Sequence, residues 1–179
     1  MNDKLAQALH IIIHEAEKHA WPLGAVKLTK SLVMSEAASL YSRGRPIVGV
    51  KIVKAPQGPV PDGYKEALMR LEAAGRIKII ESDQLYEPTI YQSLCEPDLA
   101  EFSERDREII STLTPTCCNE YTAKALSSLT HNHFWEIVDM GEEIPLAAYL
   151  WPEDFDGGPL TDAEMTQLDQ ALRDVGLNV

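Results

Sequence analysis

Two cysteines and two histidines in the second half of the chain are the residues most able to bind a metal ion. Cys117 and Cys118 are adjacent, and His131 and His133 are separated by one residue. Tetrahedral zinc sites usually take cysteines two to four residues apart, so that both thiolates can point at one ion. Adjacent cysteines rarely do so, and a His-x-His pair on a helix directs its imidazoles to different sides. We therefore predict buried thiols and no metal site.

A cysteine nucleophile is the second chemistry that these residue types allow. Cys95 or Cys118 would need a histidine base, for which His131 is available, and backbone donors for an oxyanion. The residues around either cysteine match no pattern typical of a nucleophile. We predict no catalytic residue, no cofactor and no enzymatic activity.

The segment from Tyr41 to Arg76 is rich in residues that constrain the backbone. Gly44 and Pro46 follow one helical pattern, and the run Gly58-Pro59-Val60-Pro61 precedes another. This run resembles a phosphate-binding loop only superficially, because proline removes the amide donors that such a loop needs. The segment is typical of a rigid surface, which favours binding over catalysis.

Basic side chains are concentrated around this segment, and they leave two interpretations open. They are Lys27, Lys30, Arg43, Arg45, Lys51 and Lys54. A helix followed by a strand pair with basic residues is compatible with a winged-helix-like DNA-binding regulator. Against that, the residues do not form one assured row on a helix face, and no aromatic residues lie between them as stacking platforms. A surface that faces a protein partner is the preferred interpretation, and binding to nucleic acid is disfavoured.

Length and composition describe a globular chain with an uneven charge. The 179 residues are 45% hydrophobic and carry a net charge of −12. Residues 1–80 contain 12 basic and 7 acidic side chains, whereas the remainder contains 4 and 21. Such asymmetry suggests that the two halves attract each other or face different partners. Short apolar runs, the absence of a secretory pattern and only three cysteines predict a cytoplasmic protein without a membrane segment.

The periodicity of apolar residues predicts an α+β fold that is mostly α, with about seven helices and a small antiparallel β-sheet between the third helix and its neighbours. In the first half we expect helices at 3–20, at 25–43 and from a cap at Asp62 to Gly75, and strands at 50–53, 76–81 and 85–90. The strand at 76–81 is expected to pair with the strand at 50–53.

The second half is expected to be helical. A capping box of Ser103 and Asp106 begins one helix, and Pro115 ends it. Asn119 and Asn132 are expected to cap two further helices, the second of which stops at Gly141. A buried helical turn at 144–151, an acidic Gly-rich linker at 152–160 and a C-terminal helix at 161–179 complete the chain.

The order of several motifs resembles the Panacea domain of SocA-like antitoxins and phage-associated relatives. The motifs are Lys27-Leu28-x-Lys30-x-Leu32, Tyr41, Gly44-Arg45-Pro46-Ile47-x-Gly49, Gly58-Pro59-Val60, Leu71, Gly75, Phe102-Ser103, His131, Trp135, Gly141 and Ile144-Pro145. The resemblance covers roughly residues 5–150, within an expected domain at 1–151. It implies a bacterial or phage cytoplasmic antitoxin that binds and neutralises a separately encoded protein toxin. Some members deliver the toxin to a AAA+ protease as proteolytic adaptors.

The predicted partner-binding surface is centred on the Gly/Pro-rich segment. Its residues are Tyr41, Arg43, Arg45, Pro46, Lys51, Lys54, Gly58, Pro59 and Tyr64, with Trp151 beside the acidic linker. Rigid backbone geometry would lower the entropic cost of association. The expected partner is a protein toxin encoded by an adjacent gene.

Overall fold

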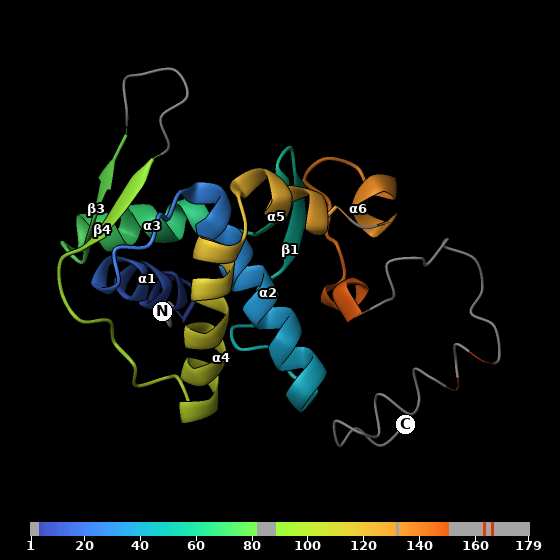
Figure 1. Cartoon of the computed structure of the whole chain (residues 1–179), viewed down its shortest axis with the longest axis horizontal. Coiled ribbons are helices and arrows are strands. Elements are labelled where there is room, and N and C mark those ends of the chain that lie inside the picture. The colour runs from blue at the N-terminus through green and yellow to red at the C-terminus, as the bar shows by residue number, and fades with distance from the viewer. Residues whose placement is uncertain (1–3, 82–88, 132, 151–162, 164–165, 167–179) are drawn as a thin grey trace.

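The computed structural model describes residues 4–81, 89–131 and 133–150, together with residues 163 and 166. Within them lie six α-helices and two antiparallel two-stranded sheets (Figure 1), which confirms the mostly helical α+β class. The elements are α1 (Lys4–Lys18), α2 (Ala25–Arg43), β1 (Ile52–Ala55), β2 (Gly58–Pro61), α3 (Tyr64–Ala73), β3 (Ile77–Ile80), β4 (Ile90–Ser93), α4 (Glu104–Pro115), α5 (Ala123–Leu129) and α6 (His133–Ile137). The predicted linker at 152–160 and all but two residues of the predicted C-terminal helix lie outside the described residues.

Helix α2 is the central element of the fold. It packs against α1, α4, α5 and β2, and it crosses the middle of the molecule in Figure 1. The helix ends where the sequence predicts, because Gly44 adopts a left-handed conformation (φ 68°) and its N–H donates to the Leu40 carbonyl. Glycine tolerates this conformation without a steric penalty.

Helix α1 is more enclosed than its apolar pattern predicts. Six consecutive residues, from Ala8 to Ile13, are buried. The helix packs against α2, α3, α4 and β4, so it has contacts on several sides rather than one apolar stripe. Its side chains join α3 and β3 in the main hydrophobic core.

The predicted pairing of the first strand is wrong. Strand β1 pairs with β2 as a hairpin, with Val53 opposite Val60, and the segment expected as a turn is itself a strand. The Asp62 N–H donates to the Lys51 carbonyl, which makes that pair hydrogen-bonded. Hydrogen-bonded and non-hydrogen-bonded pairs alternate along an antiparallel ladder. Pro59 and Pro61 therefore belong to non-hydrogen-bonded pairs, in which no N–H is needed toward β1. Asp62 therefore closes the hairpin, and Gly63 rather than Asp62 is the N-cap of α3.

Strand β3 pairs instead with β4, in a second hairpin. Ile80 lies opposite Ile90, and Ile77 lies opposite Ser93. Of the return strand predicted at 85–90, residues 85–88 lie outside the described part of the chain, and β4 comprises Ile90–Ser93. Figure 1 places this hairpin beside α1 and α3, at the opposite end of the molecule from α6.

An ion pair joins the start of α4 to the end of α2. The predicted capping box is present, with Ser103 and Asp106 bonded reciprocally. Asp106 also accepts from Arg43 Nη2 at 2.5 Å, and both side chains are largely buried. Burial alone would raise the pKa of Asp106, but the hydrogen bonds from Ser103 and Arg43 outweigh it and hold the pKa below its ordinary value of 3.8.

Two predicted helix boundaries in the second half differ from the structure. Helix α4 ends at Pro115 as predicted, and a π-helical turn follows it directly at Thr116–Glu120. Helix α6, by contrast, ends at Ile137 and not at the predicted Gly141. Thr122, not Asn119, caps α5, and its hydroxyl accepts from the Ala125 N–H. Residue 132, the predicted cap of α6, lies outside the described residues. The helical turn expected at 144–151 is a 3₁₀ helix at Leu146–Leu150.

We predict that Asp106→Asn lowers the free energy of unfolding at pH 7 by about 1–3 kcal/mol, because Arg43 loses its charged partner. The unfolded carboxyl titrates near its ordinary value of 3.8 and the folded one lower. The stabilisation is therefore complete above that value and is lost as the pH falls through the folded pKa. Urea unfolding at pH 7 and at pH 3 measures both effects. Glu108→Gln, in an exposed pair with Arg105, is the matched control and should change stability by less than about 0.5 kcal/mol. Equal losses in the two variants would contradict this assignment.

Candidate functional site

Helix α2 carries two ionisable side chains into the interior. Lys30 and Glu36 are both fully buried. Isolated buried charges are costly, so each needs hydrogen-bond partners or a shifted pKa. Each side chain reaches a different Gly/Pro-rich segment and holds it in place by hydrogen bonds.

Lys30 fixes the hairpin of β1 and β2. Its Nζ donates to the Pro59 carbonyl at 2.5 Å, on the edge of β2 that faces away from β1. A Cβ on Gly58 would lie 2.6 Å from this Nζ and 3.0 Å from the His131 ring, so a larger residue would have to displace the Lys30 ammonium. Burial lowers the pKa of Lys30 to about 7.

Aromatic and polar side chains from α5 and α6 enclose the turn of the same hairpin, residues 55–58. The rings of His131 and Trp135 stack with centroids 3.7 Å apart. Trp135 Nε1 donates to the Ala55 carbonyl, and Ser127 Oγ donates to the Gln57 carbonyl at 2.6 Å. Lys54 places its ammonium 4.6 Å from the Trp135 ring centroid, a cation–π contact. Burial, followed by the nearby Lys30 charge, lowers the pKa of His131.

Glu36 fixes the second segment, residues 44–49, which we call the Gly/Pro loop. Its two carboxylate oxygens accept from the Val48 N–H at 2.8 Å and the Gly49 N–H at 3.0 Å. Burial raises the pKa of Glu36, and these two amides partly offset that effect. Ser39 and Lys4 donate to the carbonyls of Arg45 and Ile47, respectively. Main-chain groups of the loop are thus bonded from both α1 and α2.

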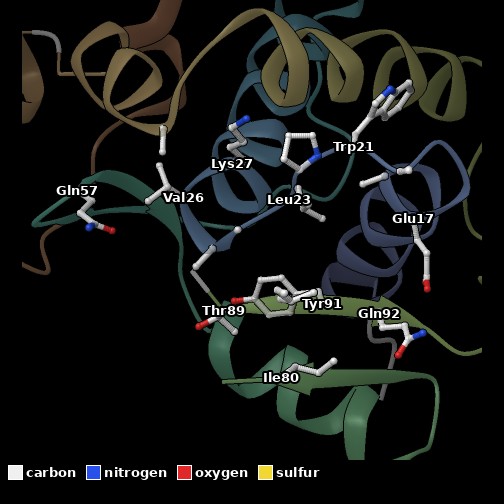
Figure 2. A pocket seen from close by; sticks show the side chains of 17 residues that line it. Glu17, Trp21, Leu23, Val26, Lys27, Gln57, Ile80, Thr89, Tyr91 and Gln92 are labelled. Carbon is white, nitrogen blue, oxygen red and sulfur yellow. The ribbon is translucent and has the colours of Figure 1, made fainter. Parts of the chain in front are cut away.

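A large groove lies outside these two clusters, between β4 and the turn that joins α1 to α2 (Figure 2). Its volume is about 870 Å³. One wall comprises Trp21, Leu23 and Val26, and the other is formed by the end of β3 and by β4. Sequence reasoning missed the groove, because Trp21-Pro22-Leu23-Gly24 indicates only the end of a helix and the opposite wall is 60 residues away in the chain. None of the predicted site residues lines it.

The predicted binding residues are divided between buried and exposed positions. Arg43 is committed to Asp106, and Gly58 and Pro59 are buried in the Lys30 cluster. Tyr64 packs against the core, whereas Tyr41 is half exposed and Arg45 is exposed at the end of α2. The structure places Pro46 in the Gly/Pro loop and Lys51 just before β1; Trp151 lies outside the described residues.

The basic residues likewise form no exposed row. Five of the six have internal or paired contacts within the described residues. Lys30 and Arg43 are bonded as described; Lys27 donates to the Cys118 carbonyl, Lys51 pairs with Glu143, and Lys54 donates to the Val138 carbonyl. This arrangement removes the groove-facing row that a winged-helix DNA reader would use.

The cysteines show no sign of activation. Cys117 and Cys118 are buried, and burial raises both pKa values, that of Cys118 to about 11. A raised pKa disfavours the thiolate, which is the reactive and metal-binding form. Across the described residues, no group of three or more His, Cys, Asp or Glu side chains could hold a metal ion. The side chain of His133 is not described.

A polar cluster between α1 and β4 was not anticipated from the sequence. Ser93 Oγ lies 3.1 Å from His10 Nε2 and 3.2 Å from His14 Nδ1, and His14 Nε2 lies 3.2 Å from Glu96. The order serine–histidine–carboxylate is that of a hydrolase triad. However, the Ser93 hydroxyl donates to the Cys95 carbonyl at 2.9 Å, so its proton is directed away from His14. The cluster serves as a clamp that holds β4 on α1.

The sequence matches the model of a known protein family. A family model described as antitoxin SocA-like, Panacea domain, matches residues 28–136, more than half of the chain. The chain belongs to the SocA-like antitoxin, Panacea domain family. The matched region of the Panacea domain begins two residues before Lys30 and ends one residue after Trp135, so it contains both clusters on α2. No curated protein and no solved structure matched the chain.

We predict that Gly58→Ala destabilises the Panacea domain by about 2–5 kcal/mol, the sum of left-handed strain and overpacking. Gly58 has φ +96°, and a Cβ there would displace Lys30 Nζ, which is fully buried and donates to the Pro59 carbonyl. Gly75→Ala is the control: it has φ +65° with nothing within 4 Å, so strain alone should cost about 1–2 kcal/mol. Chemical unfolding compares them, and equal losses would show that the Lys30 cluster is not tightly packed.

We also predict that Lys30→Met changes the pH dependence of stability. Between pH 7 and the ordinary lysine pKa of 10.5 the unfolded chain binds a proton at Lys30 that the folded chain lacks. Folding stability therefore rises with pH in this window, by up to about 1.4 kcal/mol per pH unit, and falls as the pH is lowered toward 7. Urea unfolding at pH 7.5 and pH 9 should show this rise in the native chain and in Lys65→Met, an exposed control, but not in Lys30→Met. Parallel pH profiles for all three would refute a desolvated Lys30.

Proposed function

We propose that this protein is the antitoxin of a toxin–antitoxin system and that it neutralises a protein toxin by direct binding. The family match over residues 28–136 carries the proposal. Antitoxin function requires a surface that occludes a partner, and it requires no bond-making group.

The side-chain arrangement supports a binding role. The ionisable groups inside the fold are used to hold backbone segments: Lys30 binds a carbonyl, and Glu36 binds two amides. The thiols of Cys117 and Cys118 are held in the unreactive protonated form. Within the described residues, no helix is long and apolar enough to cross a membrane. The use of Lys30 and Glu36 to hold backbone segments suits a preformed protein-binding surface, and we infer a non-enzymatic role.

The proposal predicts that the protein encoded by the neighbouring gene arrests bacterial growth when it is expressed alone. Co-expression with this chain should restore growth, and the two proteins should co-purify. Gly58→Ala, which disturbs the fold, should lose rescue, whereas Gly75→Ala should retain it at a temperature where it remains folded. A neighbour that is harmless, or that does not associate with the chain, would refute the antitoxin role.

Delivery to a AAA+ protease is a second mode of neutralisation. The amount of antitoxin needed per toxin distinguishes it from occlusion. Occlusion requires at least one antitoxin per toxin, whereas an adaptor acts at lower amounts because it is reused. Quantitative immunoblots of both proteins at the threshold of rescue, in cells with and without the protease, measure this ratio. A ratio near one that is unaffected by loss of the protease supports occlusion.

A further inference from the structure

We infer that the antitoxin docks its toxin along the free edge of β4, where an extended, basic segment of the toxin adds a strand and places apolar side chains in the adjoining groove. This inference rests on the proposed function and names its surface.

The hydrogen-bond register identifies the free edge. The Leu94 N–H donates to the Arg76 carbonyl, so the pairs 78/92 and 80/90 are also hydrogen-bonded. In the pairs between them, 79/91 and 77/93, the main-chain N–H and carbonyl groups point away from the partner strand. Two glutamates occupy outward amides: Glu72 accepts from Ile79 at 2.8 Å, and Glu17 accepts from Ser93.

Tyr91 is the outward position on β4 that precedes Ser93. No described residue bonds its main-chain N–H or carbonyl outside the ladder. Its side chain is buried (9% exposed), which fixes the orientation of its backbone. An unpaired strand edge of this kind is a template for β-strand addition, in which main-chain hydrogen bonds supply affinity and side-chain pockets supply specificity.

The groove lies directly beside this edge. Figure 2 shows Tyr91 and Thr89 across the space from Val26 and Leu23, and Gln92 also lines the groove. Ile80 and Ile90, opposite each other in the ladder, are 39% and 53% exposed. Exposed apolar side chains beside an unpaired edge mark an interaction site, because an uncovered edge of this kind otherwise promotes aggregation.

The charges beside the groove favour a basic segment of the toxin. Glu17 is exposed at the end of the edge, and its carboxylate accepts from the Ser93 N–H. Lys27, the cation of the opposite wall, is turned toward the Cys118 carbonyl and points away from β4 in Figure 2. The whole chain carries a net charge of −12, which steers a basic partner toward it. A toxin segment with a basic residue near Glu17 and apolar residues over Ile90 fits this surface.

The test uses the full chain and the full-length protein encoded by the neighbouring gene. Ile90→Asp should weaken their association at least about tenfold, the effect of a central interface residue. Ile137→Asp on α6, also an exposed isoleucine (61%), is the matched control and should bind as the native chain does. Glu17→Gln keeps an acceptor for the Ser93 amide but removes the charge, so it should weaken binding and reduce its salt dependence.

Hydrogen exchange measures strand addition itself. Binding should slow exchange of the Tyr91 amide, and the fold of each variant is checked by circular dichroism. Native binding with unchanged exchange at Tyr91, or equal affinity of Ile90→Asp and Ile137→Asp, would overturn the docking surface while leaving the antitoxin role intact. Self-association that Ile90→Asp abolishes without affecting toxin binding would assign the edge to a second copy and would likewise overturn it. No binding by the native chain would overturn the proposed function.

Discussion

The burial of two ionisable side chains, one basic and one acidic, on one helix is the constraint on which the rest of this structure depends. Lys30 and Glu36 lie inside the molecule, where an ion without partners would be strongly destabilising. Each side chain is hydrogen-bonded to main-chain groups of a Gly/Pro-rich segment. Lys30 donates to a carbonyl of β2, and Glu36 accepts from two amides of the Gly/Pro loop. The two segments therefore have to occupy fixed positions on α2, and the glycines at 44, 49 and 58 supply the positive φ angles that these positions require.

The fixed positions of these two segments explain how the family motif would favour binding of a partner. A segment that is already ordered loses little conformational entropy when a partner binds, so modest contact area can give useful affinity. The motif residues are mostly internal, however, and they shape the surface without forming it. The groove beside β4, by contrast, is lined by side chains outside that motif, apart from Lys27.

Local features of the fold were predictable from the sequence, whereas long-range ones were not. Gly44 ends α2, and Ser103 with Asp106 begins α4, because capping is decided within a few residues. The pairing of β1 with β2 was missed, since two prolines argue against a strand unless its register is known. Burial of Lys30 could not be predicted, because lysine is usually exposed and its partner is 29 residues away. The groove was missed for the same reason: its walls are distant in the chain, and none of its residues does chemistry.

Amide hydrogen exchange of the free, full-length chain at Val48 and Gly49 tests the central claim most directly. If Glu36 holds the Gly/Pro loop in place before any partner arrives, both amides should exchange as slowly as the amides in the middle of α2. Exchange at the rate of an unstructured chain would show that the loop is not fixed by α2, and it would contradict the account of a surface formed in advance of binding.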